Sequence, residues 1–202
     1  IKSLKKRLEK VRSQRDQGRR SRQRAGVPVV SLVGYTNVGK STLFNRMTAS
    51  DVYADNRLFA TLDPTLRRLR LADTEPLILA DTVGFIRQLP HDLVESFSST
   101  LEETRDASLL LHVVDAAAVD RDELMKHVDD VLQQIGADEL PQLIIYNKID
   151  RLENVQPKLE RDQQGKICRI WLSAHTGEGL DLLRLALQEY FPEQLSAIES
   201  VN

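Results

Sequence analysis

The stretch GYTNVGKS, residues 34–41, has the spacing G-x-x-x-x-G-K-S of a phosphate-binding loop. It follows the apolar, β-branched run 29–33 and precedes helical sequence at 40–48, the strand–loop–helix setting that such a loop requires. The glycines let backbone N–H groups point at phosphate oxygens, and the helix adds its positive end. We expect Lys40 to reach the β- and γ-phosphates and the Ser41 hydroxyl to bind Mg²⁺. The candidate phosphate-binding residues are Gly34, Tyr35, Thr36, Asn37, Val38, Gly39, Lys40, Ser41 and Thr42.

Strand-like and helical stretches alternate through the rest of the chain, which predicts an α/β fold with a mostly parallel sheet and helices on both faces. Ligands of such sheets bind at the carboxyl ends of the strands, so further site residues are expected there. We expect six strands, at 29–33, 66–71, 77–80, 109–114, 143–146 and 167–172. The expected helices lie at 40–48, 89–105, 120–136 and 179–191.

A D-x-x-G sequence follows the strand 77–80. Asp81 there can hold Mg²⁺ through water, and Gly84 can offer its N–H to a γ-phosphate. In the preceding loop FATLDPT, Thr61 and Thr65 both qualify to place a hydroxyl on Mg²⁺. The candidates in these two segments are Phe59, Ala60, Thr61, Leu62, Asp63, Asp81, Thr82, Val83 and Gly84.

Two further strand ends predict the recognition of guanine. In the sequence NKID, the Asp150 carboxylate can accept hydrogen bonds from the N1–H and N2 amino groups that guanine presents side by side. Lys148 would pack its stem along the base, and Asn147 would connect loops. After the last strand, the Ala174 N–H would meet guanine O6. The candidates are Asn147, Lys148, Ile149, Asp150, Ser173, Ala174 and His175, and the whole set predicts a P-loop GTPase fold.

The runs GYTNVGKSTLFNRMT, FATLDPT, DTVGFIRQLPHDLVESFSSTLEE and NKID resemble the HflX family of GTPases over residues 27–191. The resemblance implies a GTP-binding and GTP-hydrolysing switch that binds the large ribosomal subunit, its rRNA and protein, and acts in splitting or rescue of stalled ribosomes. It also selects Thr61 as the threonine on Mg²⁺. The implied catalytic residues are then Lys40, Thr61 and Gly84, and the implied metal ligands are Ser41, Thr61 and Asp81.

Two positions bear on the rate of hydrolysis. Many GTPases orient the attacking water with a glutamine directly after D-x-x-G, but Phe85 stands there, which predicts slow intrinsic hydrolysis that a partner stimulates. Asn37 is the residue that ligates a monovalent cation in related GTPases, so K⁺ is a second candidate cofactor. Loops 52–65 and 81–95 should order with GTP and relax with GDP.

Charge divides the 202-residue chain. Residues 1–26 carry 11 basic and 2 acidic residues, against 17 and 28 in the remainder. We therefore expect a basic helix and linker at 1–26 that ends an upstream domain, a GTPase domain at 27–192 and a tail at 193–202. The single cysteine, Cys168, fits the reducing cytoplasm, and no apolar run approaches the ~20 residues of a membrane span. We expect a monomer.

Two other functions fit the same residues. One is a GTPase that assists ribosome assembly or tRNA maintenance, which shares every nucleotide motif. The other is a nucleotide-gated binding module with negligible catalysis, which Phe85 leaves open. GTP turnover by the isolated chain separates an enzyme from such a module.

Overall fold

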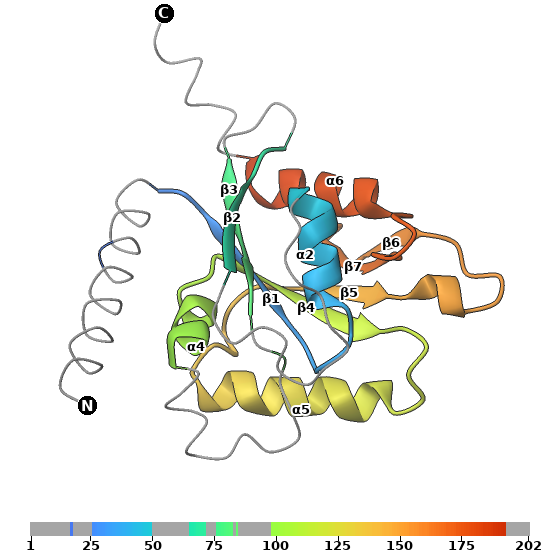
Figure 1. Ribbon diagram of the computed structural model, residues 1–202, viewed down its shortest axis with the longest axis horizontal. Helices are drawn as coiled ribbons and strands as arrows, with labels where there is room; N and C mark the ends of the chain where they lie inside the picture. Colours follow the sequence, from blue (N-terminus) through green and yellow to red (C-terminus); the bar gives the residue numbers. More distant parts are fainter. Residues whose placement is uncertain are drawn as a thin grey trace, which may run out of the picture.

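The computed structural model describes residues 26–49, 65–71, 76–82, 84 and 98–192, together with Gln17. These residues form one twisted sheet with helices on both faces (Figure 1). The strands are β1 (Val29–Val33), β2 (Thr65–Leu69), β3 (Leu77–Asp81), β4 (Leu109–Asp115), β5 (Gln142–Asn147), β6 (Lys158–Arg161) and β7 (Ile167–Trp171). The helices are α2 (Lys40–Thr48), α4 (Ser98–Arg105), α5 (Arg121–Gln134), the 3-10 turn η1 (Ile149–Arg151) and α6 (Leu180–Tyr190).

The strand order is β2-β3-β1-β4-β5-β7-β6. The five inner strands are parallel, and β2 and β6 pair antiparallel at the two edges. Because β1 lies between β3 on one side and β4 on the other, the strand order reverses at β1. In open α/β sheets, this is where a crevice for a ligand forms outside the carboxyl ends. The phosphate-binding loop directly follows β1, so the topology places it in that crevice.

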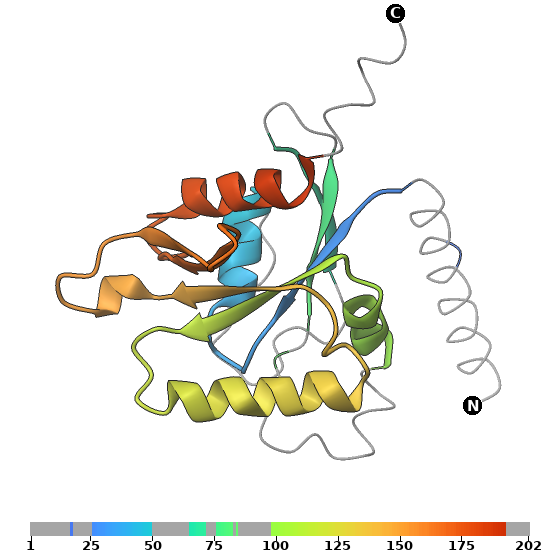
Figure 2. The ribbon, with the colours of Figure 1, turned by 180° about the vertical axis from the view of Figure 1, so that it is seen from behind.

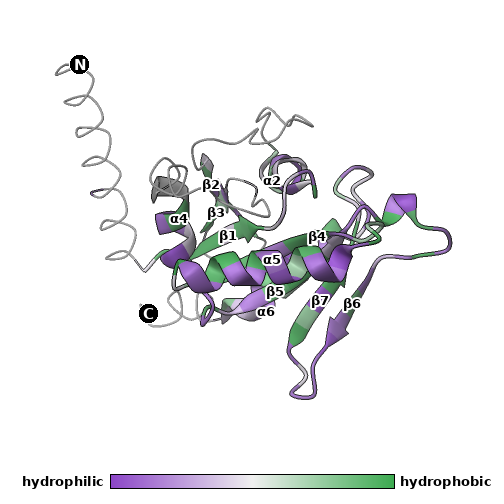
Figure 3. Ribbon diagram, turned by 90° about the horizontal axis from the view of Figure 1, so that it is seen from below, coloured by the Kyte–Doolittle hydropathy of each residue, from purple (hydrophilic) through white to green (hydrophobic). Residues whose placement is uncertain are grey.

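The helices cover the sheet because each has an apolar side. On one face, α2 contributes Leu43, Phe44 and Met47 to a core that α6 completes with Leu183, Ala186 and Leu187. On the other face, Leu101 of α4 packs with Val128, Val131 and Leu132 of α5. The two groups of helices lie on opposite sides of the strands when the molecule is seen from behind (Figure 2). The central strands β1 and β4 are predominantly hydrophobic, whereas the edge strand β6 is largely polar and polar and apolar residues alternate along α5 (Figure 3).

The α/β fold with a mostly parallel sheet is confirmed, but the expected count of six strands is wrong. The seventh strand among the described residues is β6, whose sequence KLER contains one apolar residue. It lies at the edge of the sheet and pairs only with β7, so only Leu159 of its four side chains contributes to the core. An edge strand of this kind leaves no apolar run for a sequence pattern to detect.

The expected helices are found where the structure describes them. Helix 40–48 is confirmed with both its ends, and helices 120–136 and 179–191 appear as α5 and α6. Helix α4 is the described part of the stretch 89–105, whose residues 89–97 lie outside the described residues, as do nearly all of the basic segment 1–26 and the tail 193–202. In the part of the chain that the structure describes, no helix is long and apolar enough to cross a membrane.

Candidate nucleotide-binding site

The loop between β1 and α2 depends on its two glycines. Gly34 and Gly39 have φ angles of 145° and 97°, and the side chain of any other residue would overlap the carbonyl oxygen of Val113 or the amide nitrogen of Asn147. Asn37 also adopts a left-handed conformation, with φ of 60°. These three positions bend the loop tightly over the start of α2. The curved backbone and the helix N-terminus together form the anion-binding arrangement that the sequence predicts.

Lys40 crosses the inside of this loop. Its Nζ atom donates hydrogen bonds to the carbonyl oxygens of Gly34 at 3.0 Å and Tyr35 at 2.8 Å, and the residue is 6% exposed. Burial lowers the pKa of Lys40 to about 8, although the Asp81 carboxylate acts in the opposite direction. A phosphate group is a far stronger partner for an ammonium ion than two neutral carbonyl groups. Lys40 is therefore a buried cation suited to an anionic ligand.

Ser41 and Asp81 form the candidate metal site. The Ser41 hydroxyl donates to Asp81 Oδ2 at 2.7 Å, across the gap between the start of α2 and the end of β3. Hydroxyl and carboxylate oxygens are the hard ligands that Mg²⁺ prefers, so this donor pair fits that ion. Thr82 is buried, and its hydroxyl donates to the carbonyl oxygen of Leu32, so its side chain joins β3 to β1.

Gly84 lies directly against the phosphate-binding loop. A Cβ atom at this position would be 2.9 Å from Thr36 Cγ2 and 3.1 Å from Lys40 Nζ. The Gly84 backbone is thus adjacent to the lysine that should contact the terminal phosphate. Thr65, the alternative threonine, is the first residue of β2 and pairs with Asp81. The candidates Phe59, Ala60, Thr61, Leu62, Asp63 and Val83, together with Phe85 and most of the two switch loops, lie outside the described residues.

Asn147 connects three loops at the carboxyl edge of the sheet. Its Nδ2 donates to the Val38 carbonyl oxygen at 2.8 Å, and its Oδ1 accepts the Ala174 N–H at 2.9 Å. The side chain is buried, at 2% exposure. The N–H that was expected to meet guanine O6 is therefore donated to Asn147 in this structure. Asn147 joins the phosphate-binding loop to both loops expected to hold the base.

Asp150 is the candidate guanine acceptor. It lies in η1 and is exposed. Ser173 Oγ donates to Asp150 Oδ1 at 2.5 Å, so one oxygen of the carboxylate is held by the other base loop. The neighbouring His175 is exposed, and its carbonyl oxygen accepts a hydrogen bond from Arg46 of α2. Ser173 therefore joins the two base loops to each other, and Arg46 joins the second of them to α2.

Three functional neighbours escaped the sequence analysis. Asp115, at the end of β4, accepts a hydrogen bond from Lys148. Tyr146 and Trp171, which precede the two base loops, stack with ring centroids 4.3 Å apart. Asp115 ends a buried strand as Asp81 does, so its position at a strand end was an available signal. The contact between the two aromatic rings could be predicted only from the register of β5 and β7, in which Tyr146 lies opposite Trp171.

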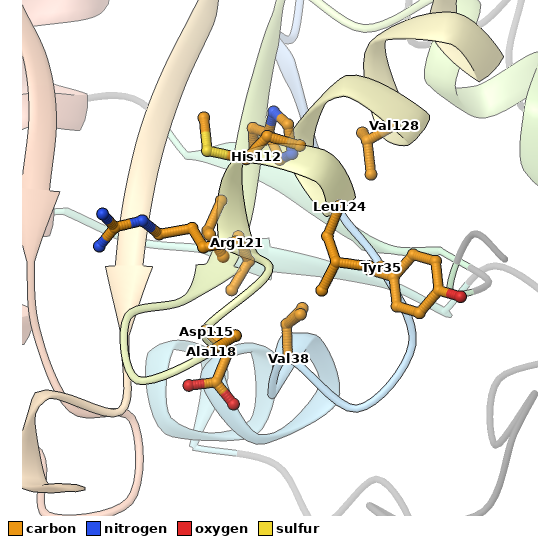
Figure 4. A pocket seen from close by; sticks show the side chains of 11 residues that line it. Tyr35, Val38, His112, Asp115, Ala118, Arg121, Leu124 and Val128 are labelled. Carbon is orange, nitrogen blue, oxygen red and sulfur yellow. The ribbon is translucent and has the colours of Figure 1, made fainter. Parts of the chain in front are cut away.

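A small hollow lies beneath the phosphate-binding loop, between β4 and the start of α5 (Figure 4). Its volume is about 10 Å³, and apolar side chains such as Val38, Leu124 and Val128 form much of its wall. Such a space holds one water molecule at most. His112 also borders it, and burial lowers the pKa of this histidine to about 4, so it is neutral at physiological pH. The hollow has no room for a nucleotide.

Together, the fold and the site define a P-loop protein of the GTP-hydrolysing class. Along the carboxyl edge of a parallel sheet, the phosphate-binding loop after β1 lies between Asp81, at the end of β3, and the NKID loop after β5. The chain belongs to the family described as 50S ribosome-binding GTPase, whose model matches residues 29–148.

The relatives agree with this assignment. GTPase HflX of Escherichia coli strain K12 is 58% identical over 189 residues, which cover 94% of this chain but only 44% of that protein. The resemblance to the HflX family is therefore confirmed, and the chain spans less than half the length of this relative.

Solved structures share the fold. A GTP-binding protein from Sulfolobus solfataricus in complex with GDP superposes with a TM-score of 0.63 and 24% identity, covering 96% of this chain and 60% of that one. Era, in complex with MgGDPNP and a fragment of 16S ribosomal RNA, superposes with a TM-score of 0.65 and 22% identity, covering 81% of this chain and 56% of that one.

Proposed function

We propose that this GTPase binds the large ribosomal subunit in a nucleotide-dependent manner and acts, in the cytoplasm, in the splitting or rescue of stalled ribosomes. The observation that carries the nucleotide part is the position of Asn147, whose two hydrogen bonds hold the phosphate loop and the base loops together at one edge. The 58% identity to HflX supports the ribosomal part.

The phosphates of GTP would bind between the loop and Gly84. Lys40 would exchange its two carbonyl partners for phosphate oxygens, and the Gly84 N–H would donate to the γ-phosphate. Ser41 would ligate Mg²⁺ directly and Asp81 through water, with Thr61 completing the set. When bound, the ion supplies neutralisation of charge on the β- and γ-phosphates.

Asn37 is proposed as a ligand of K⁺. It is exposed and takes a left-handed backbone conformation at the tip of the loop. A cation held there would lie close to the phosphates and would neutralise negative charge that develops during hydrolysis. The cation would thereby compensate in part for the absence of a catalytic glutamine, since Phe85 occupies that position.

The base would be selected by Asp150. Its exposed carboxylate is oriented by Ser173, and guanine offers two adjacent N–H donors to it. Adenine lacks that pair, so it would leave the carboxylate without matching donors. Lys148 would lie along the face of the base.

The output of the nucleotide switch would be the ordering of loops 52–65 and 81–95 when GTP is bound. Gly84 abuts Thr36 and Lys40, so a γ-phosphate that enters between them must contact the start of the second loop. The basic segment 1–26 would add contacts to phosphates of ribosomal RNA, because it carries 11 basic and 2 acidic residues. The proposal includes the division of the chain into a basic segment at 1–26, a GTPase domain at 27–192 and a tail at 193–202.

The test is GTP hydrolysis by this chain in K⁺ buffer, with and without purified large ribosomal subunits. We expect slow turnover that the subunits stimulate, and Lys40→Ala should abolish both activities. Replacement of Asp150 by Asn should shift the preference from GDP to XDP, because the amide can donate to the second carbonyl group of xanthine. Turnover that the subunits leave unchanged would contradict ribosome sensing by these residues, whereas unchanged base preference would contradict the base site.

A further inference from the structure

Asp115 holds the lysine of the NKID loop in place before any nucleotide binds. The Lys148 Nζ atom donates to Asp115 Oδ2 at 2.7 Å and to the carbonyl oxygen of Asn37 at 2.6 Å. Both partners of the ion pair are largely buried, with side chains 18% exposed. The ammonium group is therefore fixed between the end of β4 and the phosphate-binding loop.

The backbone of Lys148 makes such support necessary. Its φ angle is 66°, in the left-handed region that a non-glycine residue adopts only at a cost in free energy. Residues in this conformation persist where the surroundings impose it. The two hydrogen bonds from the side chain, together with the Arg151 N–H bond to the Lys148 carbonyl oxygen, provide that restraint.

A fixed lysine binds a base better than a mobile one. The flexible side chain of a free lysine must lose most of its rotamer freedom when it packs along a ring. Asp115 imposes that loss in the folded protein, so binding of the base does not have to supply it. The lysine side chain is then already fixed at both ends, at the backbone and at the ammonium group, before the base arrives.

We propose that Asp115 is a positioning residue for nucleotide affinity: it orders Lys148 in advance and so tightens the binding of guanine nucleotides. This inference rests on the base site proposed above. Asp115 acts through Lys148 and does not itself touch the nucleotide.

Asp115 makes a second contact, and a test must distinguish its effect from that of the ion pair with Lys148. Its Oδ1 accepts the N–H of Ala117 at 3.0 Å, which supports the turn after β4. An asparagine can keep this bond through its amide oxygen but cannot form the ion pair with Lys148. Arg151 is 4.0 Å away and largely exposed, so it is a weaker partner for the carboxylate. Asp115→Asn therefore removes the positioning role and preserves the turn.

The experiment compares Asp115→Asn, Lys148→Met and the double variant, with GDP affinity measured by calorimetry and GTP turnover measured in steady state. We expect Asp115→Asn to raise the Kd for GDP and the KM for GTP about tenfold, with kcat unchanged, because the lysine must now be ordered during binding. The double variant should bind no more weakly than Lys148→Met alone, since without the ammonium group Asp115 has nothing to hold. Asp122→Asn, which removes the same charge from a side chain 90% exposed, should change neither constant.

Additive effects of the two substitutions, or a fall in kcat at constant KM, would overturn the positioning role. A loss of thermal stability in Asp115→Asn without a change in Kd would overturn it too, because a purely structural residue behaves in that way. The wild type and Asp150→Asn are measured beside these variants. If the wild type shows no preference for GDP over XDP, the proposed base site is wrong. If that preference is present and Asp115→Asn binds GDP with normal affinity, only the inference on Asp115 is wrong.

Discussion

Replacement of Asn147 by alanine tests whether one side chain holds the nucleotide site together. The substitution removes a buried donor to the Val38 carbonyl group and a buried acceptor of the Ala174 N–H. Val38 and Ala174 are 4% and 1% exposed, so water has little access to the two groups that lose their partner. The three loops would then lose their common link, although the Lys148–Asn37 and Ser173–Asp150 hydrogen bonds would remain.

The expected cost follows from these contacts. A buried polar group left without a partner costs about 1–3 kcal/mol, and two such groups are created. We therefore expect the free energy of unfolding to fall by about 3 kcal/mol, a large part of the roughly 5–15 kcal/mol that stabilises a domain. GDP affinity should fall as well, because the phosphate loop and the base loops lose their common anchor.

Urea unfolding followed by circular dichroism measures the first effect, and calorimetric titration with GDP measures the second. Gln134→Ala is the control, because it removes a carboxamide from an exposed position of α5 and should change stability by less than about 0.5 kcal/mol. A loss below about 1 kcal/mol in Asn147→Ala, with normal GDP binding, would refute the reasoning, since it would mean that the loops keep their geometry without this side chain.

Three further predictions concern the phosphate side. Burial lowers the pKa of Lys40 to about 8, and a bound phosphate should raise this pKa again. GTP affinity should therefore fall about fivefold from pH 8 to pH 9 in calorimetric titrations, as the free protein loses the proton that binding requires, whereas Lys40→Met should bind weakly with no such pH dependence. In Gly84→Ala the new methyl group would press on Thr36 and Lys40, so single-turnover hydrolysis should slow by at least about tenfold while GDP affinity stays within about threefold; an unaltered rate would show that the γ-phosphate does not bind here. Hydrolysis should be faster in K⁺ than in Na⁺ at matched ionic strength, and Asn37→Ala should abolish the difference; equal rates in the wild type would exclude the cation site.

Local patterns predicted β1, β3 and β4 because each is a mostly apolar run with buried side chains on both faces. Strands β5 and β7 were predicted from shorter apolar runs and are buried less completely. Helix α2 was also predicted with both its ends. Gly39 stands directly before the helix, and the periodic helical sequence begins at Lys40. Strand β6 was not predicted because its sequence, KLER, contains no apolar run. The turn residues 162–165 between two extended stretches were the signal for a hairpin there, and they indicate the antiparallel pair that the structure contains.

The contacts that build the site are of a different kind. The bond from Asn147 to Val38 spans 109 residues, and the bond from Lys148 to Asp115 spans 33. No local pattern contains such pairs, because they arise only when parallel strands bring their carboxyl ends to one edge. The sequence could therefore name the residues of the loops, but it could not say that Asp115 supports Lys148 or that Ala174 already donates its N–H to Asn147.

The stack of Tyr146 and Trp171 has a practical consequence. Trp171 is the only tryptophan in the chain, its indole N–H donates to Glu160 at 3.1 Å, and it stands two residues before Ser173. Emission from an indole responds to small changes in its surroundings, and these surroundings are joined to both base loops. Intrinsic fluorescence of the unlabelled protein should therefore follow the arrival and departure of a guanine base in real time, with no dye attached to the nucleotide.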